Sequence, residues 1–553
     1  MRGEDTERIV AELVSRVCAR TTRTGPARIR EILEEADYHE RKRLEADKRR
    51  GPAHARDAEF WSKVRSRLRH ASERDLRQTL REVVEHYAAE IRGNFDPRVY
   101  GLTTRVLPTG LGLLLNAVSP LKLVQRFPQL PKMEDRIIIQ GEVEHLRRLH
   151  ERGTVLFVPT HLSNLDSPMV GFALYRMGLP PFVYGAGLNL FANPLLSFFM
   201  HNLGAYTVDR KKQDPLYKRV LKEYATLSLE HGYDNLFFPG GTRSRSGALE
   251  SKLKRGLLGT GLAAYIQNLQ RGAPRPRIFV VPCTLSSQLV LEAETLIDDF
   301  LQEVGKSRYI IDDDEFSQPR RVFDFIAQLS SLDSKTHVTV CPGLDPFGNR
   351  VDEDGVSLDP RGRAIDERRY VFSGGEPRSM PDRDAEYTSE LAESIADAFA
   401  CHNVIESTHV TARALFQLLR ERNPSLSTLR LIRTGGDEDD LPLSMLYDEA
   451  ERLLTVLRGL ADRGRVRLGP SARGPADEVV ADGLMHFSIY HRRAAARRRG
   501  DRVVPSDRTL LLYYQNRLEG YGLPGGDVLT DDRRALRSPR SLDGSAATAR
   551  GDA

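Results

Sequence analysis

Apolar residues recur at three- and four-residue spacing through the first hundred positions, with Arg and Glu between them. The segments 7–17 (ERIVAELVSRV) and 75–91 (DLRQTLREVVEHYAAEI) show the pattern clearly, and it is the period of an amphipathic helix. Gly51 and Pro52 interrupt it, because glycine and proline break helices. The pattern predicts an N-terminal helical region, a hairpin or bundle, over residues 1–130.

From about Arg136 onward, short runs of β-branched and aromatic residues alternate with helical segments. Such alternation is typical of an α/β layer fold with a largely parallel sheet flanked by helices. We expect this α/β domain over residues 131–384. The predicted strands are 154–159, 181–187, 205–210, 235–240, 277–285 and 337–344, and the predicted helices are 167–177, 193–203, 215–231 and 256–270.

The rest of the chain returns to helical spacing after a Gly-, Asp- and Pro-rich segment, 345–385, which we expect to be extended. A C-terminal helical region is predicted over residues 385–529, divided by the polar loop 434–440. The tail, residues 530–553, is polar and of low complexity, which is a composition typical of disorder.

Composition narrows the class of protein. The chain has 553 residues, with 82 Lys and Arg against 77 Asp and Glu, giving a formal net charge of +5. A chain of this length is expected to form about three domains. The small positive excess argues against nucleic-acid binding, which would need a basic stripe, but it permits attraction to an anionic membrane surface or substrate.

Four cysteines, far apart in the sequence, indicate a reducing compartment. None forms a C-x-x-C pair, so we expect neither a disulfide scaffold nor a cysteine zinc site, and we predict no metal and no cofactor. The N-terminus is charged from residue 2 and lacks the apolar core of a secretory signal. The four cysteines are Cys18, Cys283, Cys341 and Cys401.

Two apolar stretches approach the length of a membrane span without having its composition. A spanning helix needs about 20 mostly apolar residues. Residues 106–121 are uncharged but interrupted by proline and glycine. Residues 177–208 hold no Lys, Arg, Asp or Glu but are broken by prolines, asparagines and a histidine. We interpret both as apolar surface interrupted by turns. The chain is 40% hydrophobic and 29% charged, and this balance excludes a polytopic membrane protein.

The first candidate for chemistry is residues 159–166 (PTHLSNLD), between a predicted strand and a predicted helix. Histidine is the side chain best suited to general-base work near neutral pH. Asp166, on the same turn, could accept the second ring N–H of His161 and fix its tautomer. The alternative is a helix-capping loop, with Asn164 or Asp166 as the cap.

A second cluster, residues 237–247 (FFPGGTRSRSG), follows another predicted strand. Its glycines let the backbone approach a ligand, and backbone N–H groups can then surround an anion. Arg243 and Arg245 supply bidentate donors for a phosphate. The cluster is not a Walker loop, since Gly-Lys-Ser is absent. A basic solvated loop is the alternative.

Two further strand ends complete the set. Residues 204–210 end in Asp209 and Arg210, for which a surface ion pair is the simplest interpretation. Residues 280–284 (VVPCT) indicate a buried strand that we expect to end at Pro282. Ligands of parallel sheets bind at the carboxyl ends of strands, where we place all these clusters.

The order of the four blocks is more specific than any one of them. His-x-x-x-x-Asp, Gly-x-x-x-x-Asp-Arg, Phe-Pro-x-Gly-Thr-Arg-Ser-Arg and Val-Pro follow one another within about 125 residues. This arrangement resembles the glycerolipid acyltransferase superfamily over roughly residues 135–345. The stretches 341–363, 383–399 and 510–523 are similar to the long glycerol-3-phosphate acyltransferases and extend the resemblance to about residues 95–525. The resemblance implies an acyltransferase α/β domain between N- and C-terminal helical regions.

The resemblance also implies a role for individual residues. His161 would be the general base that deprotonates the acceptor hydroxyl, and Asp166 would orient it. Pro282 would lie beside the acyl-thioester site. The residues implied to bind the glycerol phosphate or to shape its pocket are Arg210, Gly241, Thr242, Arg243, Ser244 and Arg245.

One position departs from the family pattern. The family usually has a glutamate where this chain has Gly240, and that acid is thought to help hold the polyol. If the pocket needs such an acceptor, we expect a backbone carbonyl, a bound water or a neighbouring carboxylate to provide it. The alternative is that Gly240 adopts a backbone conformation with φ > 0, where a side chain costs stability.

Together these features predict a glycerol-3-phosphate 1-O-acyltransferase, which moves a fatty acyl group from acyl-CoA or acyl-carrier protein to the sn-1 hydroxyl in the first step of phospholipid synthesis. Its partners would be glycerol 3-phosphate, the acyl donor and a membrane surface. We expect no binding of nucleic acid. We expect a peripheral protein on the cytoplasmic face of the cell membrane. The uncharged stretch 177–208 would line the acyl chain or lie on the bilayer, or else form ordinary core. The alternatives are dihydroxyacetone-phosphate or lysophosphatidate acylation, and a non-catalytic lipid-binding scaffold on the same fold.

Overall fold

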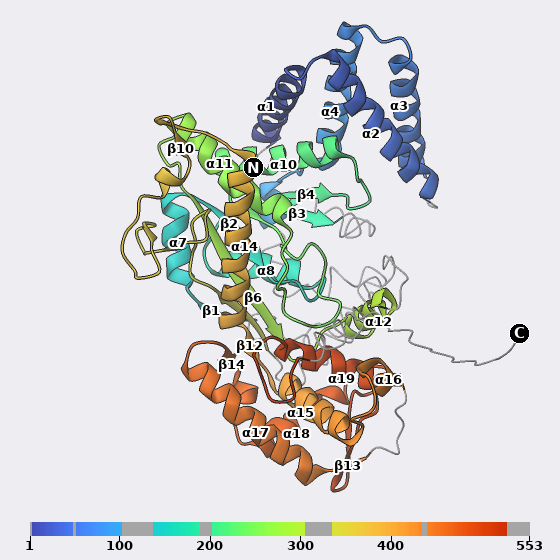
Figure 1. Cartoon of the computed structure of the whole chain (residues 1–553), viewed down its shortest axis with the longest axis vertical. Coiled ribbons are helices and arrows are strands. Elements are labelled where there is room, and N and C mark those ends of the chain that lie inside the picture. The colour runs from blue at the N-terminus through green and yellow to red at the C-terminus, as the bar shows by residue number, and fades with distance from the viewer. Residues whose placement is uncertain are drawn as a thin grey trace, which may run out of the picture. The chain divides into compact units, whose positions relative to one another are not determined.

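A computed structural model of the chain describes residues 3–47, 51–101, 137–187, 202–304, 335–433 and 440–527 (Figure 1). The chain divides into two compact units. The first unit consists of residues 1–245, 250–404 and 460–467, so the N-terminal helices belong to the same unit as the α/β part. The second unit consists of residues 246–249, 405–459 and 468–553. The apolar segment 106–121, the middle of the stretch 177–208 and the tail 530–553 lie outside the described residues.

The N-terminal region is helical, as the spacing predicts. Its helices are α1 (Gly3–Thr22), α2 (Pro26–Ala46), α3 (Pro52–Leu68) and α4 (Glu73–Ile91). Helices α2 and α3 each begin at a proline, whose missing N–H costs nothing in the first turn. Helix α4 begins with a capping box, in which the Ser72 side chain and the Asp75 side chain each accept a backbone N–H of the other residue.

These helices share one hydrophobic core with α10 (Pro215–Glu230) of the α/β part. Trp61 and Tyr87 are fully buried in it, beside Tyr217 of α10. At its edge, the Arg16 guanidinium lies 2.8 Å from the Glu230 carboxylate, which joins α1 to α10. Burial of this apolar surface is what attaches the helical bundle to the sheet domain.

The α/β part is built on a seven-stranded sheet of order β1-β7-β6-β2-β5-β3-β4. Neighbouring strands are parallel except for β6 and β7, so the predicted, largely parallel sheet is confirmed. The strand β1 precedes the first strand that the sequence pattern predicts. The strands are β1 (Ile137–Gly141), β2 (Thr154–Pro159), β3 (Val183–Gly187), β4 (Ala205–Val208), β5 (Asn235–Leu236), β6 (Ile278–Ser287) and β7 (Thr336–Val340).

The parallel arrangement brings the predicted clusters to one edge of the sheet. Strand β2 is flanked by β6 and β5, and β5 is followed in the sheet by β3 and β4. Because these five strands run in one direction, the loops that leave β2, β4 and β5 emerge at the same edge. The helices of this part, besides α10, are α7 (Val143–Arg152), α8 (Asp166–Arg176), α11 (Arg255–Gln270), α12 (Ala293–Val304) and α14 (Pro381–His402).

The expectation that β6 ends at Pro282 is wrong, because the strand continues to Ser287. Up to Cys283 the strand pairs with β2, and from Cys283 onward it pairs with β7. Pro282 therefore stands at the changeover between two ladders, where a strand can tolerate a residue without an N–H donor.

The segment 345–385, expected to be extended, is folded into turns and short hairpins. Asp345, Asp352 and Asp359 each accept the backbone N–H groups of the residues two and four positions later. Such turns are typical of aspartate before glycine-containing loops. The small elements here are β8 (Arg350–Val351), β9 (Ser357–Leu358), η5 (Glu367–Tyr370), β10 (Phe372–Ser373) and β11 (Glu376–Pro377).

The second unit is mainly helical, as predicted, and also contains two- and three-residue strands that the pattern does not indicate. Its helices pack around buried leucines of α15 and α19. The helices are α15 (Ser407–Arg422), α16 (Thr428–Arg433), α17 (Leu443–Asp462), η7 (Pro470–Ala472), α18 (Ala476–Phe487), α19 (Arg508–Gln515) and η8 (Asn516–Leu518). The strands in and beside it are β12 (Val404–Ile405), β13 (Leu441–Pro442), β14 (Arg467–Leu468), β15 (Arg497–Arg499) and β16 (Arg502–Val504).

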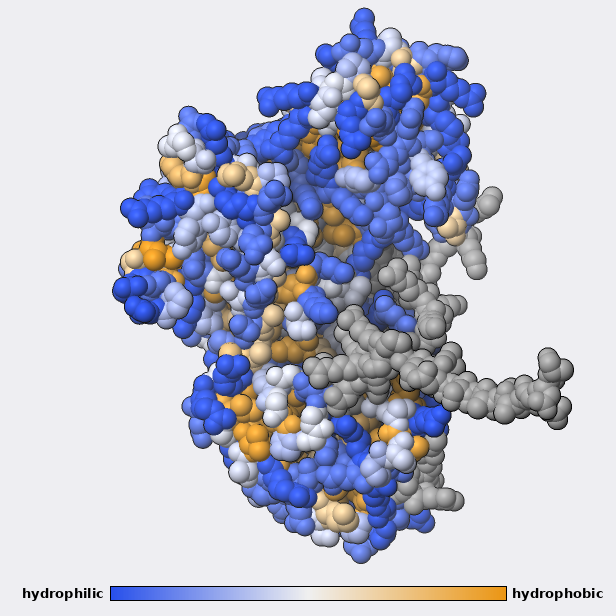
Figure 2. Space-filling view, viewed as in Figure 1, coloured by the Kyte–Doolittle hydropathy of each residue, from blue (hydrophilic) through white to orange (hydrophobic). Residues whose placement is uncertain are grey.

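Within the described part of the chain, no helix combines the length and the apolar composition that a bilayer crossing requires. Figure 2 shows hydrophilic residues over much of the viewed face, with apolar residues in small groups. Large exposed apolar side chains are scattered along the described sequence, at Tyr38, Tyr175, Phe372, Met380, Met445 and Met485.

Candidate active site

The loop after β2 holds His161 and Asp166 in direct contact. Asp166 is the first residue of α8, and its Oδ2 accepts a hydrogen bond from His161 Nδ1 at 3.0 Å. The same oxygen accepts the backbone N–H groups of Leu162 (2.6 Å) and Ser163 (2.8 Å). The aspartate thus organises the loop and orients the imidazole at once. With Nδ1 as the donor, Nε2 carries the lone pair that a general base needs.

The surroundings of His161 favour its neutral form. The ring is 8% exposed and stacks on Phe238 of the next loop, with 4.0 Å between the ring centres. Burial lowers the pKa of His161 below its usual value, the bond to Asp166 opposes this, and the positive charges of Arg243 and Arg210 add to the lowering. A neutral imidazole at neutral pH can accept a proton without first losing one.

The arginine-bearing loop after β5 is attached to the histidine loop through the backbone. The N–H of Ser244 donates to the carbonyl of His161 at 2.8 Å, and the N–H of Lys254 donates to the carbonyl of Pro239 at 2.7 Å. Gly241 has φ +77°, and a Cβ there would lie 2.9 Å from the Lys254 side chain. Glycine is therefore required at position 241, both by backbone conformation and by space.

The three arginines that we predict to bind the phosphate differ in their surroundings. Arg243 is largely buried and lies 3.3 Å from a Glu292 oxygen, whereas Arg245 contacts two acids of α12, Asp299 at 2.9 Å and Glu303 at 2.8 Å. Arg210 is exposed, and no ion pair of its side chain is found among the described residues.

The three guanidinium groups lie close enough to influence one another. Surrounding protein atoms and then the charges of Arg243 and Arg245 lower the pKa of Arg210. Positive charges that repel one another at one edge of a sheet favour the binding of an anion, because the anion relieves that repulsion. The charges of Arg243 and Arg210 also lower the pKa of His161, so these two arginines lie near the base.

The remaining predicted residues have less distinctive surroundings. Thr242 is exposed and Ser244 is half-buried, on the same loop as the arginines. Pro282 is buried in β6 opposite Val158 of β2, so it supports the strand that ends in the histidine loop. The roles assigned to these three residues stay predictions.

Glu292 is a site residue that the sequence pattern did not identify. It is fully buried, and its carboxylate accepts hydrogen bonds from the Ser163 hydroxyl (2.7 Å) and the Asn164 N–H (3.0 Å). The same carboxylate pairs with Arg243, so it joins the histidine loop to the arginine loop. Glu292 follows the end of β6, a region to which the rule that ligands lie at carboxyl ends of strands points, but no local pattern marks this residue.

A second carboxylate lies where the family's glutamate is absent. Glu250 Oε1 accepts the backbone N–H of His161 at 2.8 Å. A Cβ added at Gly240 would be only 2.7 Å from the Glu250 carboxyl carbon, so the two positions share one space. Glu250 is thus our candidate for the neighbouring carboxylate, one of the three replacements we expected, and this role stays a prediction. The alternative explanation is wrong, because the left-handed conformation belongs to Gly241 and not to Gly240.

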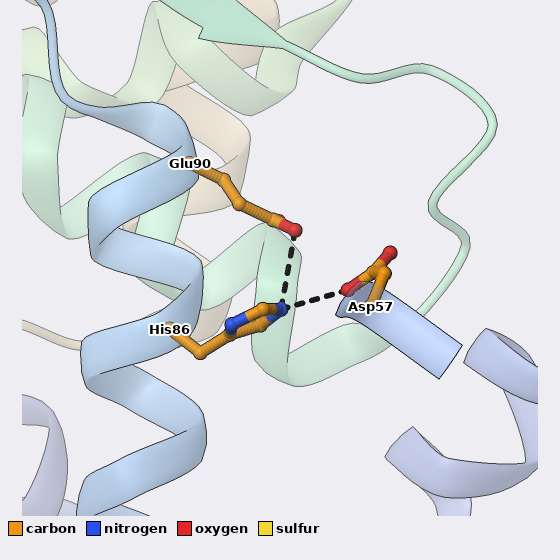
Figure 3. A group of neighbouring side chains, drawn as sticks. All are labelled: Asp57, His86 and Glu90. Carbon is orange, nitrogen blue, oxygen red and sulfur yellow. Dashed lines mark hydrogen bonds and ion pairs between the residues drawn. The ribbon is translucent and has the colours of Figure 1, made fainter. Parts of the chain in front are cut away.

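Among the residues that the structure describes, one group has the spacing of metal ligands, and it lies away from this site. Asp57 and Glu90 both contact His86 Nε2, at 2.9 and 3.2 Å (Figure 3). Arg43 pairs with Asp57, and Lys212 pairs with Glu90. Burial opposes the charge on His86, but its bonds to both carboxylates raise its pKa to about 9. These cations already neutralise the acids, so the group is an ion-pair network.

The α/β part is similar to acyltransferases. Residues 140–286 match the family model described as Acyltransferase. This span contains His161, Asp166, the three arginines and Pro282. This region of the chain is therefore similar to an acyltransferase domain.

The relatives that match this region carry a more particular name. A glycerol-3-phosphate acyltransferase of Aeromonas hydrophila is 36% identical over 154 residues, which is 28% of this chain and 18% of the relative. That of Actinobacillus succinogenes is 36% identical over 164 residues, 29% of this chain and 19% of the relative. The glycerol-3-phosphate acyltransferase of Ectopseudomonas mendocina is 30% identical over 182 residues, which is 33% of this chain and 21% of the relative. The chain thus spans about a fifth of the length of these curated relatives.

Replacing His161 by Ala, or Asp166 by Asn, should reduce acyl transfer by about 10²–10⁴-fold, the usual contribution of general-base catalysis. His145 offers a matched control, since it is also 8% exposed but bonds to a backbone carbonyl far from the loop. His145→Ala should leave turnover within about twofold. Near-normal turnover in His161→Ala, measured with thermal melting of each variant, would exclude His161 as the base.

The charge of Arg243 should contribute to the acid limit of activity, after burial and the bond to Asp166. The pKa of His161 is lowered, so the active neutral form persists to lower pH than for an ordinary histidine and is lost as pH falls through that pKa. Arg243→Gln removes one lowering charge, and the acid limb of kcat/KM should therefore move to higher pH. Arg245→Gln is the control, with a smaller shift. An unchanged limb in Arg243→Gln would contradict the coupling.

Proposed function

We propose that this protein is a glycerol-3-phosphate 1-O-acyltransferase that uses acyl-CoA or acyl-carrier protein as the donor. The observation that carries the proposal is the bond from His161 Nδ1 to Asp166, with Arg243 and Arg210 near enough for their charges to lower the pKa of His161. A general base next to an anion site fits an acceptor that carries both a hydroxyl and a phosphate. The names of the similar proteins agree with this acceptor.

The reaction needs little from the protein beyond positioning and one proton transfer. A thioester is already activated, so the acceptor hydroxyl attacks its carbonyl carbon as His161 Nε2 takes the hydroxyl proton. The carbon–sulfur bond breaks, and the thiolate leaves with a proton from the imidazolium. The products are an ester, 1-acylglycerol 3-phosphate, and a free thiol. Asp166 stabilises the transient imidazolium, as in other His–Asp pairs.

The arginines have unequal parts in this proposal. Arg245 is held by Asp299 and Glu303, and Arg243 shares its charge with Glu292. Arg210 is an exposed residue that follows β4, and no ion pair of its side chain is found among the described residues. We assign to Arg210 the largest share of phosphate binding, with Arg243 between the phosphate and the base.

The rival function is a lipid-binding scaffold without catalysis. Gly240 favoured it from the sequence, because a pocket acid is missing there. The Glu250 carboxylate lies beside Gly240 and contacts the histidine loop, and we propose that it serves as the pocket acid. Acylation of dihydroxyacetone phosphate remains the nearer alternative, because it presents the same hydroxyl and phosphate; lysophosphatidate is the other acceptor of this kind.

The proposed location is the cytoplasmic face of the cell membrane, as a peripheral protein in the first step of phospholipid synthesis. The net charge of +5 favours an anionic surface, and the uncharged stretch 177–208 offers apolar side chains. The product would carry a fatty acyl chain and a phosphate, so it would partition into the bilayer where the next enzyme of lipid synthesis acts.

Release of free thiol from a long-chain acyl-CoA, measured with and without glycerol 3-phosphate, tests the function. We expect release that depends on glycerol 3-phosphate and yields the 1-acyl product, and none from His161→Ala. Equal rates with dihydroxyacetone phosphate or lysophosphatidate would favour those acceptors. No release with any acceptor, from either acyl carrier, would leave the scaffold as the better account.

Sedimentation tests the location. Because the proposed attachment is electrostatic, the protein should pellet with vesicles that contain anionic phospholipid and remain in the supernatant with zwitterionic vesicles. High salt screens the charges and should release the protein from the anionic vesicles. Equal pelleting with both vesicle types at high and low salt would contradict an electrostatic, peripheral attachment.

A further inference from the structure

The loop between β4 and α10, residues 209–214, carries Arg210. Asp209 Oδ1 accepts the backbone N–H of Lys211 at 2.8 Å, and the N–H of Asp209 donates to the Tyr217 hydroxyl at 2.9 Å. These bonds fold the loop into a tight turn. Because no side-chain ion pair of Arg210 exists among the described residues, the backbone of this turn determines where its guanidinium can reach.

Lys212, two residues after Arg210, points from this loop into the N-terminal helices. It is 5% exposed, and its Nζ lies 2.5 Å from a Glu90 oxygen of α4 and 3.4 Å from a Glu40 oxygen of α2. The ammonium also lies 4.9 Å from the ring centre of Tyr87. A buried ammonium is stable only with such partners, so these contacts determine the position of Lys212.

The end of the loop is attached to the same helices. Asp214 caps α10 by accepting the N–H groups of Leu216 (3.1 Å) and Tyr217 (3.0 Å). Its Oδ2 also accepts the hydroxyl of Tyr87, a fully buried residue of α4, at 2.8 Å. The loop is therefore joined to α4 at two places, Lys212 and Asp214.

The ion-pair network of Figure 3 extends to this lysine. With His86 protonated, the region balances three carboxylates against three cations, and each cation contacts at least one carboxylate. Each carboxylate contacts two of the cations, so removing one cation would leave every carboxylate a partner but would leave the buried network one positive charge short. The six residues are Glu40, Asp57, Glu90, Arg43, His86 and Lys212.

We propose that the N-terminal helices position Arg210 for its anion, and that Lys212 is the positioning residue that joins them to the substrate-binding loop. The identity of the anion, glycerol 3-phosphate, rests on the proposed function. A small displacement of a binding group can cost about 10²-fold in rate. Through Lys212, a helical bundle without contact to the reacting atoms thus controls substrate affinity.

Two variants and a matched control test the proposal. Lys212→Met removes the charge but keeps the length of the side chain. Tyr87→Phe removes only a hydroxyl, so it keeps the proposal falsifiable if Lys212→Met fails to fold. The control is Arg16→Met, which breaks the buried ion pair between α1 and α10 without touching the loop.

Hydrogen exchange of the full-length protein measures directly how often the backbone of the loop opens. In Lys212→Met and Tyr87→Phe, the amides of residues 209–214 should exchange at least about tenfold faster, since local opening is governed by the contacts that hold a segment. In Arg16→Met, exchange in the loop should be unchanged. Unchanged loop exchange in both test variants would overturn the proposal whether or not the protein has the proposed activity.

Steady-state kinetics measure the effect of the loop's position on the affinity for glycerol 3-phosphate. Lys212→Met should raise the KM for glycerol 3-phosphate by about tenfold or more, with kcat and the KM for acyl-CoA within about twofold. Arg16→Met should leave all three constants unchanged. A faster-exchanging loop with an unchanged KM would overturn the positioning role. A wild-type protein without transfer to glycerol 3-phosphate would refute the proposed function, and hydrogen exchange would still support or overturn the attachment of the loop.

Discussion

The site depends on one oxygen atom, Oδ2 of Asp166. It accepts three hydrogen bonds, from the His161 ring and from two backbone N–H groups of the loop before α8. The position of an aspartate at the first turn of a helix adds a favourable interaction with the helix dipole. The sequence left two interpretations open, a His–Asp pair and a helix-capping loop, and the structure combines them, because the residue that shapes the loop also orients the base.

Two carboxylates organise the charge and the backbone around that base. Glu292 joins the histidine loop to Arg243, and Glu250 contacts the backbone of His161 from the side of Gly240. Without such partners, several guanidinium groups near one imidazole would repel one another and make the loops costly to fold. The same arrangement recurs in the N-terminal helices, where acids and bases balance around Lys212. Charge balance thus fixes both the base and the loop of Arg210.

The sequence predicted those parts of the molecule that depend on local pattern. Residues 154–159 form β2 with the expected bounds, because a short apolar run between a glycine and a polar loop favours a buried strand over other secondary structure. The short strands of the second unit were not predictable, because two or three residues carry no periodicity. Glu250 and Glu292 were missed because their contacts to the histidine loop cross 89 and 128 positions of the chain. The changeover of β6 at Pro282 likewise depends on which strands become its neighbours.

The state of His161 tests the central claim most directly. Nitrogen-15 NMR of histidine-labelled protein, with the resonances assigned by comparison with His161→Gln, reports both the tautomer and the pKa of this ring. We predict an Nδ1–H tautomer with unprotonated Nε2 and a pKa below that of an ordinary histidine. A ring that is protonated on both nitrogens at neutral pH, or a tautomer with the proton on Nε2, would contradict it.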